Sequence, residues 1–207
     1  MGTKDRRNIE KENRREHILE VATRLMAQHG VHHLNIDMVA REAELAKGTI
    51  YLYFKSKEEI IGVLSTRSRL QLLRLFEAVA ASADPPDEQL LQIIRVSYRF
   101  YTDNPLEYDL VSLFEGDNAL SETPDMLAAS QQITALVAGI VSKAKAAGAL
   151  LPGTDATLFT LNLWSMTFGV LRFIRRRGPL VAASLGLGEA DIYAAYEDII
   201  GQLLKKK

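Results

Sequence analysis

Hydrogen-bond donors are concentrated in one short stretch of the sequence, between residues 47 and 57. The side chains that carry them are Lys47, Thr49, Tyr51, Tyr53, Lys55 and Lys57. Amino and hydroxyl donors of this kind suit phosphate oxygens, which accept hydrogen bonds. Gly48 lies among them without a side chain, so the backbone there can approach a ligand closely. The stretch therefore predicts a surface that binds nucleic acid.

Two other patterns are too weak to predict a site. His29, His32 and His33 are close in sequence, but no carboxylate partner accompanies them, so we expect loop histidines and no zinc. Gly186-Leu187-Gly188 is a fragment of a dinucleotide fingerprint, yet Asp191 replaces its third glycine and no strand precedes it. The chain has no cysteine, which excludes a thiol nucleophile. We therefore expect no catalytic residue, metal or cofactor, and no enzyme.

Apolar residues recur at helical spacing along the whole chain, and caps and breakers divide them into nine segments. The sequence contains no alternating run typical of a strand. The expected fold class is therefore all-α, with an N-terminal three-helix helix-turn-helix domain and a C-terminal helical domain. The expected helices are 18–30, two brief helices within 35–54, then 56–81, 87–103, one that starts at 104, 123–147, 154–177 and 189–204.

The two brief helices between Asn35 and Lys57, braced by the first helix, predict a helix-turn-helix. Such a motif places its second helix in the major groove, which is roughly 12 Å wide. Periodicity alone fits equally well a purely structural packing of three small helices. The donors on the second helix favour DNA binding over that alternative.

The same stretch resembles the DNA-binding domain of TetR-type (TetR/AcrR) transcriptional repressors. The resemblance covers about residues 12–62 and rests on Gly30, on the run from Ile36 to Ala43 and on the run from Lys47 to Glu59, K-G-T-I-Y-L-Y-F-K-S-K-E-E. It implies a helical homodimer with a DNA-binding N-terminal domain and a divergent effector-binding domain. The DNA contacts that the resemblance implies are Asn35, Lys47, Gly48, Thr49, Tyr51, Tyr53 and Lys57.

Two residues depart from the pattern of that family. Glu44 stands where the family usually has a turn glycine, which predicts a turn with positive φ held at some conformational cost. Ala46 stands where the family often has a capping serine or threonine, so the second brief helix is expected to lack a cap worth ~1 kcal/mol. Both departures bear on the detail of the base contacts.

Two C-terminal stretches carry more apolar surface than one core requires. Residues 155–177 leave little of a helical circumference polar, and residues 192–203 place a stripe on one face. We expect one side to pack in the subunit and the other against the same helices of a second copy, an isologous interface. The resemblance implies the same interface, through about 155–177 and 189–204. A homodimer would present two recognition helices to a near-palindromic operator.

Aromatic and methionine side chains of the middle helices predict core for most of their members and a ligand cavity for a minority. The expected cavity residues are Tyr98, Tyr101, Tyr108, Met126 and Trp164, and the candidate polar anchors are Arg95, Arg99 and Asp109. A pocket of this composition suits a small apolar or aromatic effector.

Charge is unevenly distributed along the chain. The 25 basic and 26 acidic residues give a net charge of −1. Residues 1–69 hold 13 basic and 10 acidic residues, a balance of +3, whereas residues 70–207 hold 12 and 16, a balance of −4. This division excludes a nonspecific DNA coat but fits a chain that binds DNA with one small domain.

Two domains are expected. Residues 1–62 form a DNA-binding domain with an N-terminal arm, and residues 63–207 form an effector-binding and dimerisation domain. The basic residues from Lys4 to Arg15 are expected in that arm, which either reaches DNA or is simply solvated. The first residues are charged, so we expect no secretory signal and a cytoplasmic protein. Polar residues interrupt the apolar stretch 158–174, which is expected to be a buried helix and not a membrane span.

These features predict a ligand-responsive transcriptional repressor that acts as a homodimer on operator DNA and is released by a small effector. One alternative is a helical protein-interaction or ligand-binding module that does not bind DNA. A less favoured alternative is an unrecognised enzyme.

Overall fold

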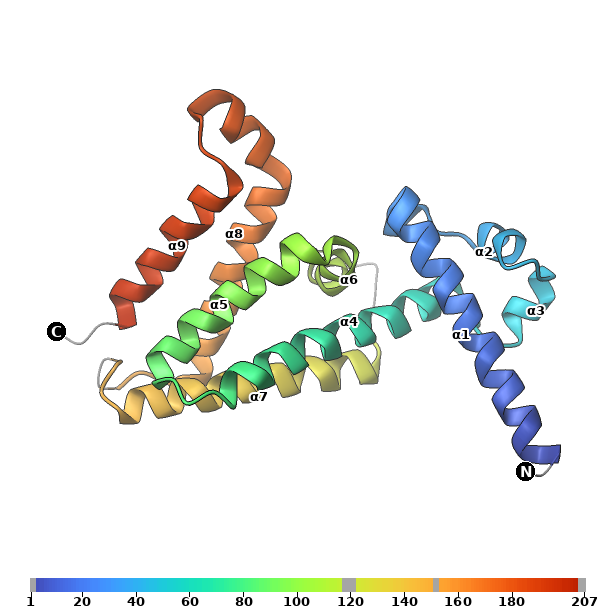
Figure 1. Cartoon of the computed structure of the whole chain (residues 1–207), viewed down its shortest axis with the longest axis horizontal. Helices are drawn as coiled ribbons and strands as arrows, with labels where there is room; N and C mark the ends of the chain where they lie inside the picture. The colour runs from blue at the N-terminus through green and yellow to red at the C-terminus, as the bar shows by residue number, and fades with distance from the viewer. Residues whose placement is uncertain (1–2, 117–121, 151–152, 205–207) are drawn as a thin grey trace. The chain divides into compact units, whose positions relative to one another are not determined.

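The structure is a computed structural model that describes residues 3–116, 122–150 and 153–204. Within these residues it contains nine α-helices, one short 3-10 helix and no strand, which confirms the expected all-helical fold. The elements are α1 (Thr3–His29), η1 (Val31–His33), α2 (Ile36–Glu42), α3 (Lys47–Tyr51), α4 (Lys57–Ala80), α5 (Pro86–Asp103), α6 (Pro105–Gly116), α7 (Pro124–Ala146), α8 (Ala156–Leu185) and α9 (Glu189–Leu204) (Figure 1).

The chain divides into two compact units. The first comprises Met1–Arg69 and Pro105–Leu127, and the second comprises Leu70–Asn104 and Ala128–Lys207. Residues of α4 contribute to both units. The first unit also includes α6, because Leu110 of that helix is buried in the same core as the N-terminal helices. The predicted boundary at residue 62 separates a DNA-binding domain from an effector-binding domain. The two compact units do not test that boundary, which stays a prediction.

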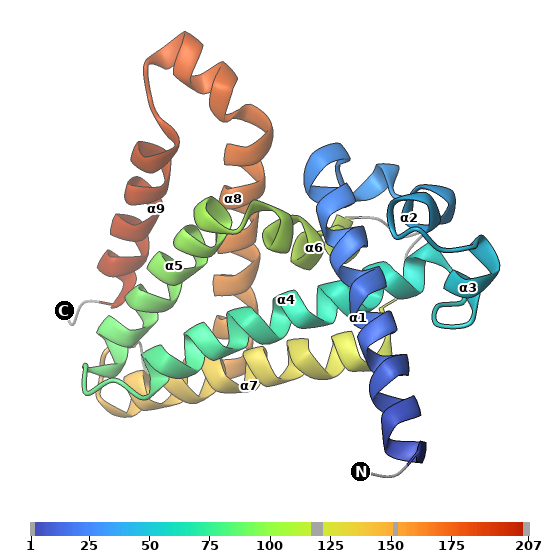
Figure 2. The same cartoon turned by 45° about the vertical axis from the view of Figure 1, so that its right-hand side comes forward.

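One hydrophobic core holds the first unit together. α1 crosses the N-terminal part of α4, and α2 and α3 pack beside it (Figure 2). The side chains that fill the core are apolar and less than a tenth exposed; among them are Ile18, Val21, Ala22, Met26, Val39, Ile50, Phe54 and Ile60. This core fixes the positions of α2 and α3, the two brief helices predicted to form the helix-turn-helix.

Residues 3–15 form the first turns of α1 and are not an irregular arm. Most of them are exposed, and Arg6 donates to Glu10 one turn further on, at 3.2 Å. Pairs of opposite charge at this spacing stabilise a helix. The helix therefore extends past the core on residues that are mostly charged.

In the second unit α5, α8 and α9 pack against one another. Tyrosines of α5 and α9 form much of this contact: Tyr98 stacks on Tyr193 with ring centroids 4.5 Å apart. The Tyr193 hydroxyl donates to the Ile94 carbonyl at 2.9 Å. The Tyr196 hydroxyl lies 2.7 Å from the Thr167 hydroxyl of α8, and burial raises the pKa of Tyr196.

α8 extends further than the sequence predicts. Gly178-Pro179 was expected to end it, but the helix continues through Pro179 to Leu185. A proline removes one backbone donor and crowds the preceding turn, which bends a helix without always ending it. The helix ends instead at Gly186, whose φ of 69° is left-handed and whose amide donates to Ala182 at 3.0 Å.

The expectation that residues 158–174 form a buried helix is correct for one face only. That face is lined by Thr160, Leu163, Thr167, Leu171 and Ile174. The opposite face exposes large apolar side chains, Leu158, Leu161, Met166, Phe173 and Leu180. By length and composition alone, with a mean hydropathy of 1.2, α8 could cross a membrane. Within this unit it is instead an amphipathic helix with one packed face.

Candidate nucleic-acid interface

The orientation of α3 is set by two side chains that point into the core. Ile50 and Phe54 are almost completely buried. Because residues at nearby positions of a short helix project in different directions, this burial turns Lys47, Gly48 and Tyr51 toward solvent. Tyr51 keeps 48% of its surface exposed, so its hydroxyl is available to a partner.

Gly48 lies on this exposed face with open space around it. A Cβ built on Gly48 would meet no heavy atom within 4 Å. The packing of the protein therefore does not require glycine here. The open position is consistent with the predicted close approach of a ligand to the backbone.

Asn35 caps α2. Its side-chain oxygen accepts a hydrogen bond from the Met38 amide at 2.9 Å, as predicted from its position before the helix. The cap uses only the oxygen of the side chain. The predicted contact of Asn35 with the DNA backbone would therefore fall to its amide group, which donates hydrogen bonds.

The turn between α2 and α3 has the conformation that the sequence predicts. Glu44 has a φ of 54°, and it is the one residue other than glycine with positive φ in the described parts of the chain. The Leu45 amide donates to Ala40 at 2.9 Å and the Glu44 amide to Arg41 at 3.2 Å. These two bonds form a Schellman motif, whose left-handed position glycine normally fills. Ala46 caps α3 without a side-chain hydrogen bond, also as predicted.

Lys47 forms an ion pair that the sequence did not predict. Its amino group lies 2.9 Å from the Asp37 carboxylate of α2, and this hydrogen bond raises the pKa of Lys47. The two residues are ten positions apart, so no local spacing rule could have found the pair. Lys47 would have to exchange Asp37 for a phosphate or base on binding DNA.

Acidic and basic side chains both lie at the start of α4. Glu59 accepts a hydrogen bond from the Lys55 amide at 2.6 Å, and the Ser56 hydroxyl accepts one from the Glu59 amide at 3.4 Å. Ser56 and Glu59 have the spacing of a capping box, but the Glu59 carboxylate accepts from the Lys55 amide and not from the Ser56 amide. A hydrogen bond from Ser56 also lowers the pKa of Glu58. Half-buried Lys57 supplies the cation at this helix start.

The two other predicted contacts are less exposed than Tyr51. Thr49 is half-buried, and half-buried Tyr53 packs against the core of the unit. Leu52, which lies between the tyrosines, was not among the predicted contacts, although 78% of its surface is exposed. The position of Leu52 two residues after buried Ile50 would have indicated this exposure.

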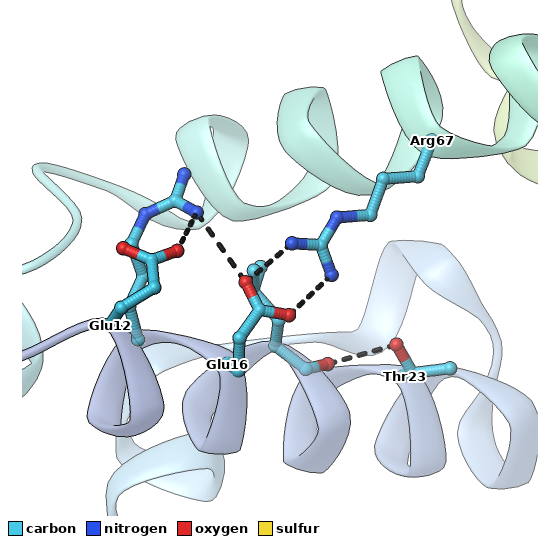
Figure 3. Close-up of polar contacts among 6 residues, drawn as sticks. Glu12, Glu16, Thr23 and Arg67 are labelled. Atoms are coloured by element: carbon cyan, nitrogen blue, oxygen red, sulfur yellow. Dashed lines mark hydrogen bonds and ion pairs between the residues drawn. The ribbon is translucent and has the colours of Figure 1, made fainter. Parts of the chain in front are cut away.

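A bidentate ion pair joins α1 to α4 (Figure 3). Arg67 donates to both carboxylate oxygens of Glu16, at 2.8 and 2.5 Å. Arg15 lies 3.6 and 3.7 Å from Glu12 and Glu16 and extends the network along α1. The Arg67 hydrogen bond lowers the pKa of the Glu16 carboxyl. The pair ties the helix that supports the helix-turn-helix to α4.

The five residues predicted to line an effector cavity divide between the two compact units. Trp164 lines a cavity of about 50 Å³ in the second unit. Tyr98 and Tyr101 instead face α9, where the Tyr101 hydroxyl lies 3.4 Å from Glu189. Tyr108 and Met126 are buried and belong to the first unit.

The remaining walls of the cavity come from residues that sequence reasoning missed. They are Phe76, Ile93, Ser97, Ile133, Thr134, Val137, Thr160, Leu161, Leu163 and Thr167. The cavity carries hydroxyl groups but no ionisable group. Arg95, a predicted anchor, pairs with Glu88 and Glu197 at 2.6 Å, and Arg99 is exposed. Asp109 belongs to the first unit.

Residues 3–116, 122–150 and 153–204 contain no group of three or more histidine or acidic residues that could hold an ion.

Comparisons with known proteins identify the N-terminal stretch. The family described as "Bacterial regulatory proteins, tetR family" matches residues 18–64. An uncharacterized HTH-type transcriptional regulator from Haemophilus influenzae is 34% identical over 90 residues, 44% of this chain and 48% of that protein. The chain thus matches about half the length of this relative.

Two further relatives align over most of the chain. The HTH-type transcriptional regulator UidR from Escherichia coli is 21% identical over 89% of this chain and 93% of UidR. The transcriptional regulator FadR from Bacillus subtilis, solved in complex with stearoyl-CoA, has the same fold. Its TM-score is 0.70 at 19% identity, over 93% of this chain and 98% of FadR.

The all-helical fold and the match over residues 18–64 indicate a helix-turn-helix domain in the N-terminal part of the chain. Residues 18–64 are thus similar to the DNA-binding domain of TetR-family transcriptional regulators.

Proposed function

We propose that this protein is a ligand-responsive transcriptional repressor that binds a near-palindromic operator as a homodimer and leaves it when a small effector binds. The observation that carries the proposal is the exposed face of α3. Lys47, Gly48 and Tyr51 face solvent there, while Ile50 and Phe54 hold the helix in the core. A regulator of this kind works in the cytoplasm, where its operator is.

The proposed DNA contacts fall into two groups. Lys47, Gly48, Thr49 and Tyr51 would face base edges and the nearest phosphates, since the start of a recognition helix reaches the bases. Asn35, Tyr53 and Lys57 would hold the phosphate backbone and fix the register of the protein on the duplex.

The proposed dimer interface is the exposed apolar face of α8 and α9. On α8 this face includes Leu158, Leu161, Met166 and Phe173, and on α9 it includes Ile199 and Leu203. Tyr193, Tyr196 and Ile200 occupy the other face of α9 and pack inside the subunit. Contiguous exposed apolar patches often mark interfaces in soluble proteins. The arginines at 172 and 175–177 disfavour the alternative in which α8 spans a bilayer.

The proposed effector site is the cavity beside Trp164. Its walls are apolar side chains and hydroxyl groups, so it would take an uncharged, mainly apolar part of a ligand. FadR from Bacillus subtilis was solved with stearoyl-CoA, and an acyl chain has this chemistry. The cavity holds about 50 Å³, far less than the 300–1,000 Å³ typical of ligand pockets. Effector binding would therefore have to displace the surrounding helices.

This displacement suggests a mechanism of release. Phe76 lines the cavity and lies on α4, the same continuous helix whose first residue, Lys57, is a proposed DNA contact. Movement of α4 would change the spacing of the two recognition helices of a dimer. Such coupling is reciprocal, so the operator must weaken effector binding by the factor by which the effector weakens operator binding. An acyl-CoA that binds equally well to free and operator-bound protein would exclude this mechanism.

A gel-shift assay with the DNA that flanks the gene tests the DNA-binding function. We expect the wild-type protein to shift a discrete fragment, with an affinity that falls as salt rises, and the double variant Tyr51→Ala/Lys57→Ala to lose this binding. Leu127→Ala, another exposed side chain, serves as the control and should bind like the wild type. Retained binding in the double variant would show that α3 is not the recognition helix. A fold-intact wild-type protein that shifts no fragment would favour the non-DNA-binding module.

A further inference from the structure

The N-terminal turns of α1 carry some basic side chains that form ion pairs and others that do not. Arg6 pairs with Glu10 at 3.2 Å, and Arg15 pairs with Glu12 and Glu16. Arg7, Lys11 and Arg14 have no ion pair within the described residues. The three unpaired cations are exposed, and we refer to them as the basic stripe.

The spacing of the basic stripe aligns its charges. Residues 7, 11 and 14 are related by i, i+4 and i+7, which places them on one face of a helix. At a rise of 1.5 Å per residue the stripe is about 10 Å long. A row of like charges repels itself and disfavours the isolated helix, so its alignment is explained better by a ligand than by stability.

One contact places the stripe beside the helix-turn-helix. The Arg15 guanidinium lies over the Phe54 ring, 5.2 Å from its centroid, and Phe54 follows α3 by three residues. Arg14 is the next residue along α1. The Glu16–Arg67 ion pair holds α1 against α4 at the same level. The stripe therefore extends outward from the end of the recognition helix.

We propose that the basic stripe binds phosphates of the duplex outside the bases that α3 reads and so lengthens the DNA footprint of the protein. This inference rests on the proposed DNA-binding function. Arginine and lysine are the usual partners of phosphates, and such contacts add affinity without adding sequence preference. The stripe is part of a rigid helix, so it binds along the backbone and does not thread into the minor groove as an extended arm.

An anionic membrane surface offers similar phosphates, but the helix does not suit it. A helix that lies in a membrane interface needs a broad apolar face opposite its charges. Among residues 3–15 the one large apolar side chain is Ile9. The neighbouring recognition helix therefore favours DNA as the polyanion.

The test compares two duplexes that contain the same selected operator, one trimmed to the operator and one with about ten base pairs added on each side. The stripe variant is Arg7→Gln/Lys11→Gln/Arg14→Gln. The control, Arg74→Gln/Arg99→Gln/Lys143→Gln, removes the same charge at exposed positions elsewhere. Binding is measured by fluorescence anisotropy between 50 and 300 mM salt, a range chosen to resolve the slope of affinity against salt.

Each phosphate contact contributes roughly 0.9 to the slope of log affinity against log salt concentration. On the long duplex we therefore expect the three substitutions of the stripe variant to reduce this slope by about 2 to 3 per protomer. Its affinity should fall at least tenfold there and change little on the trimmed duplex. Arg7→Lys/Arg14→Lys should retain the wild-type slope. The proposal is overturned if the stripe variant binds the long duplex as tightly as the control does. It is also overturned if the stripe variant loses the same affinity for both duplexes.

Two further outcomes separate this inference from the proposed function. Wild-type protein that binds neither duplex would contradict DNA binding itself, and the inference with it. Wild-type binding to both duplexes, with the stripe variant losing only attachment to vesicles of anionic phospholipid, would overturn the inference and leave the proposed function intact. Circular dichroism checks that each variant keeps its helices.

Discussion

Ile50 and Phe54 decide which side chains of α3 are available to DNA. Both are almost completely buried, and their burial turns Lys47, Gly48 and Tyr51 outward. The sequence predicts this arrangement well, because apolar and donor residues occupy different faces of a short helix. It does not predict the partner of Lys47, since Asp37 comes close only through the packing of α2 against α3.

Glu44 allows a direct test of backbone strain. Its φ of 54° is a conformation that glycine adopts without the steric cost of a Cβ. We expect Glu44→Gly to raise the free energy of unfolding by about 1 kcal/mol, because relief of strain outweighs the added freedom of the unfolded chain. Chemical denaturation measures the change. Arg41→Gly, at a helical position, should instead lower stability by about 1 kcal/mol. A loss of stability in Glu44→Gly would refute the strain.

The Glu16–Arg67 ion pair predicts a pH dependence. Because Arg67 lowers the pKa of Glu16 below its usual 4.5, the pair stabilises the fold above that pH and loses its effect as the pH falls through the lowered value. Both side chains are more than a third exposed, so the contribution is only about 0.5 kcal/mol after solvent screening.

The measurement is the difference in unfolding free energy between wild type and Arg67→Gln at pH 7 and at pH 3. We expect a difference at pH 7 that disappears at pH 3. Arg74→Gln, another exposed arginine, should show no such dependence. An equal difference for Arg67→Gln at both pH values would mean that the pair contributes nothing through its charge.

At the scale of the elements, the sequence predicts the helices better than their ends. Most bounds follow from caps and breakers, such as Asn35 before α2 and Pro86 at the start of α5. The prediction fails at Pro179, because tertiary packing carries α8 past a residue that disfavours helix. It also fails for the first turns of α1, where charged residues extend a helix beyond its core.

The packing of α4 against the start of α7 can be tested at Gly62. A Cβ on Gly62 would lie 3.2 Å from the Thr123 methyl carbon, a close contact. Replacing a helical glycine by alanine normally adds about 1 kcal/mol of stability. We expect Gly62→Ala to raise the free energy of unfolding by less than this in the wild-type background. In a Thr123→Ser background it should raise it by the full amount. Serine removes the methyl carbon and keeps the hydroxyl that accepts from the Met126 amide.

Gly139→Ala is the matched control for this cycle. It lies within α7, and its Cβ would meet no atom within 4 Å, so its gain should be the same in both backgrounds. Denaturation of the four combinations gives the coupling energy. Equal gains for Gly62→Ala in the two backgrounds would show that the contact with Thr123 does not limit the position of α7.

At the scale of the whole molecule, the sequence predicts the division of labour but not the cavity. The sequence indicates effector residues only by their aromatic or methionine side chains. The cavity itself depends on how α4, α5, α7 and α8 pack. Of the five residues, the structure brings only Trp164 to the cavity, and threonines such as Thr160 and Thr167 complete it. The excess apolar surface of α8 and α9 was easier to predict, since it follows from composition and helical spacing.

The proposed dimer makes a prediction at this scale. Phe173 and Ile199 are large, exposed and on the proposed interface. The double variant Phe173→Glu/Ile199→Glu should weaken self-association at least a hundredfold, because an unpaired buried carboxylate costs several kcal/mol. Sedimentation equilibrium measures the association. Leu127→Glu, at a comparably exposed apolar position on α7, should leave it unchanged. A double variant that associates as tightly as the wild type would place the interface elsewhere.

The most direct test of the central claim, sequence-specific DNA binding by a dimer, is selection of bound duplexes from a random library followed by sequencing. A dimer with two recognition helices should enrich an inverted repeat whose half-sites are about one helical turn apart or a multiple of it. The double variant Tyr51→Ala/Lys57→Ala should enrich nothing. Recovery of unenriched sequence by the folded wild-type protein would contradict the account.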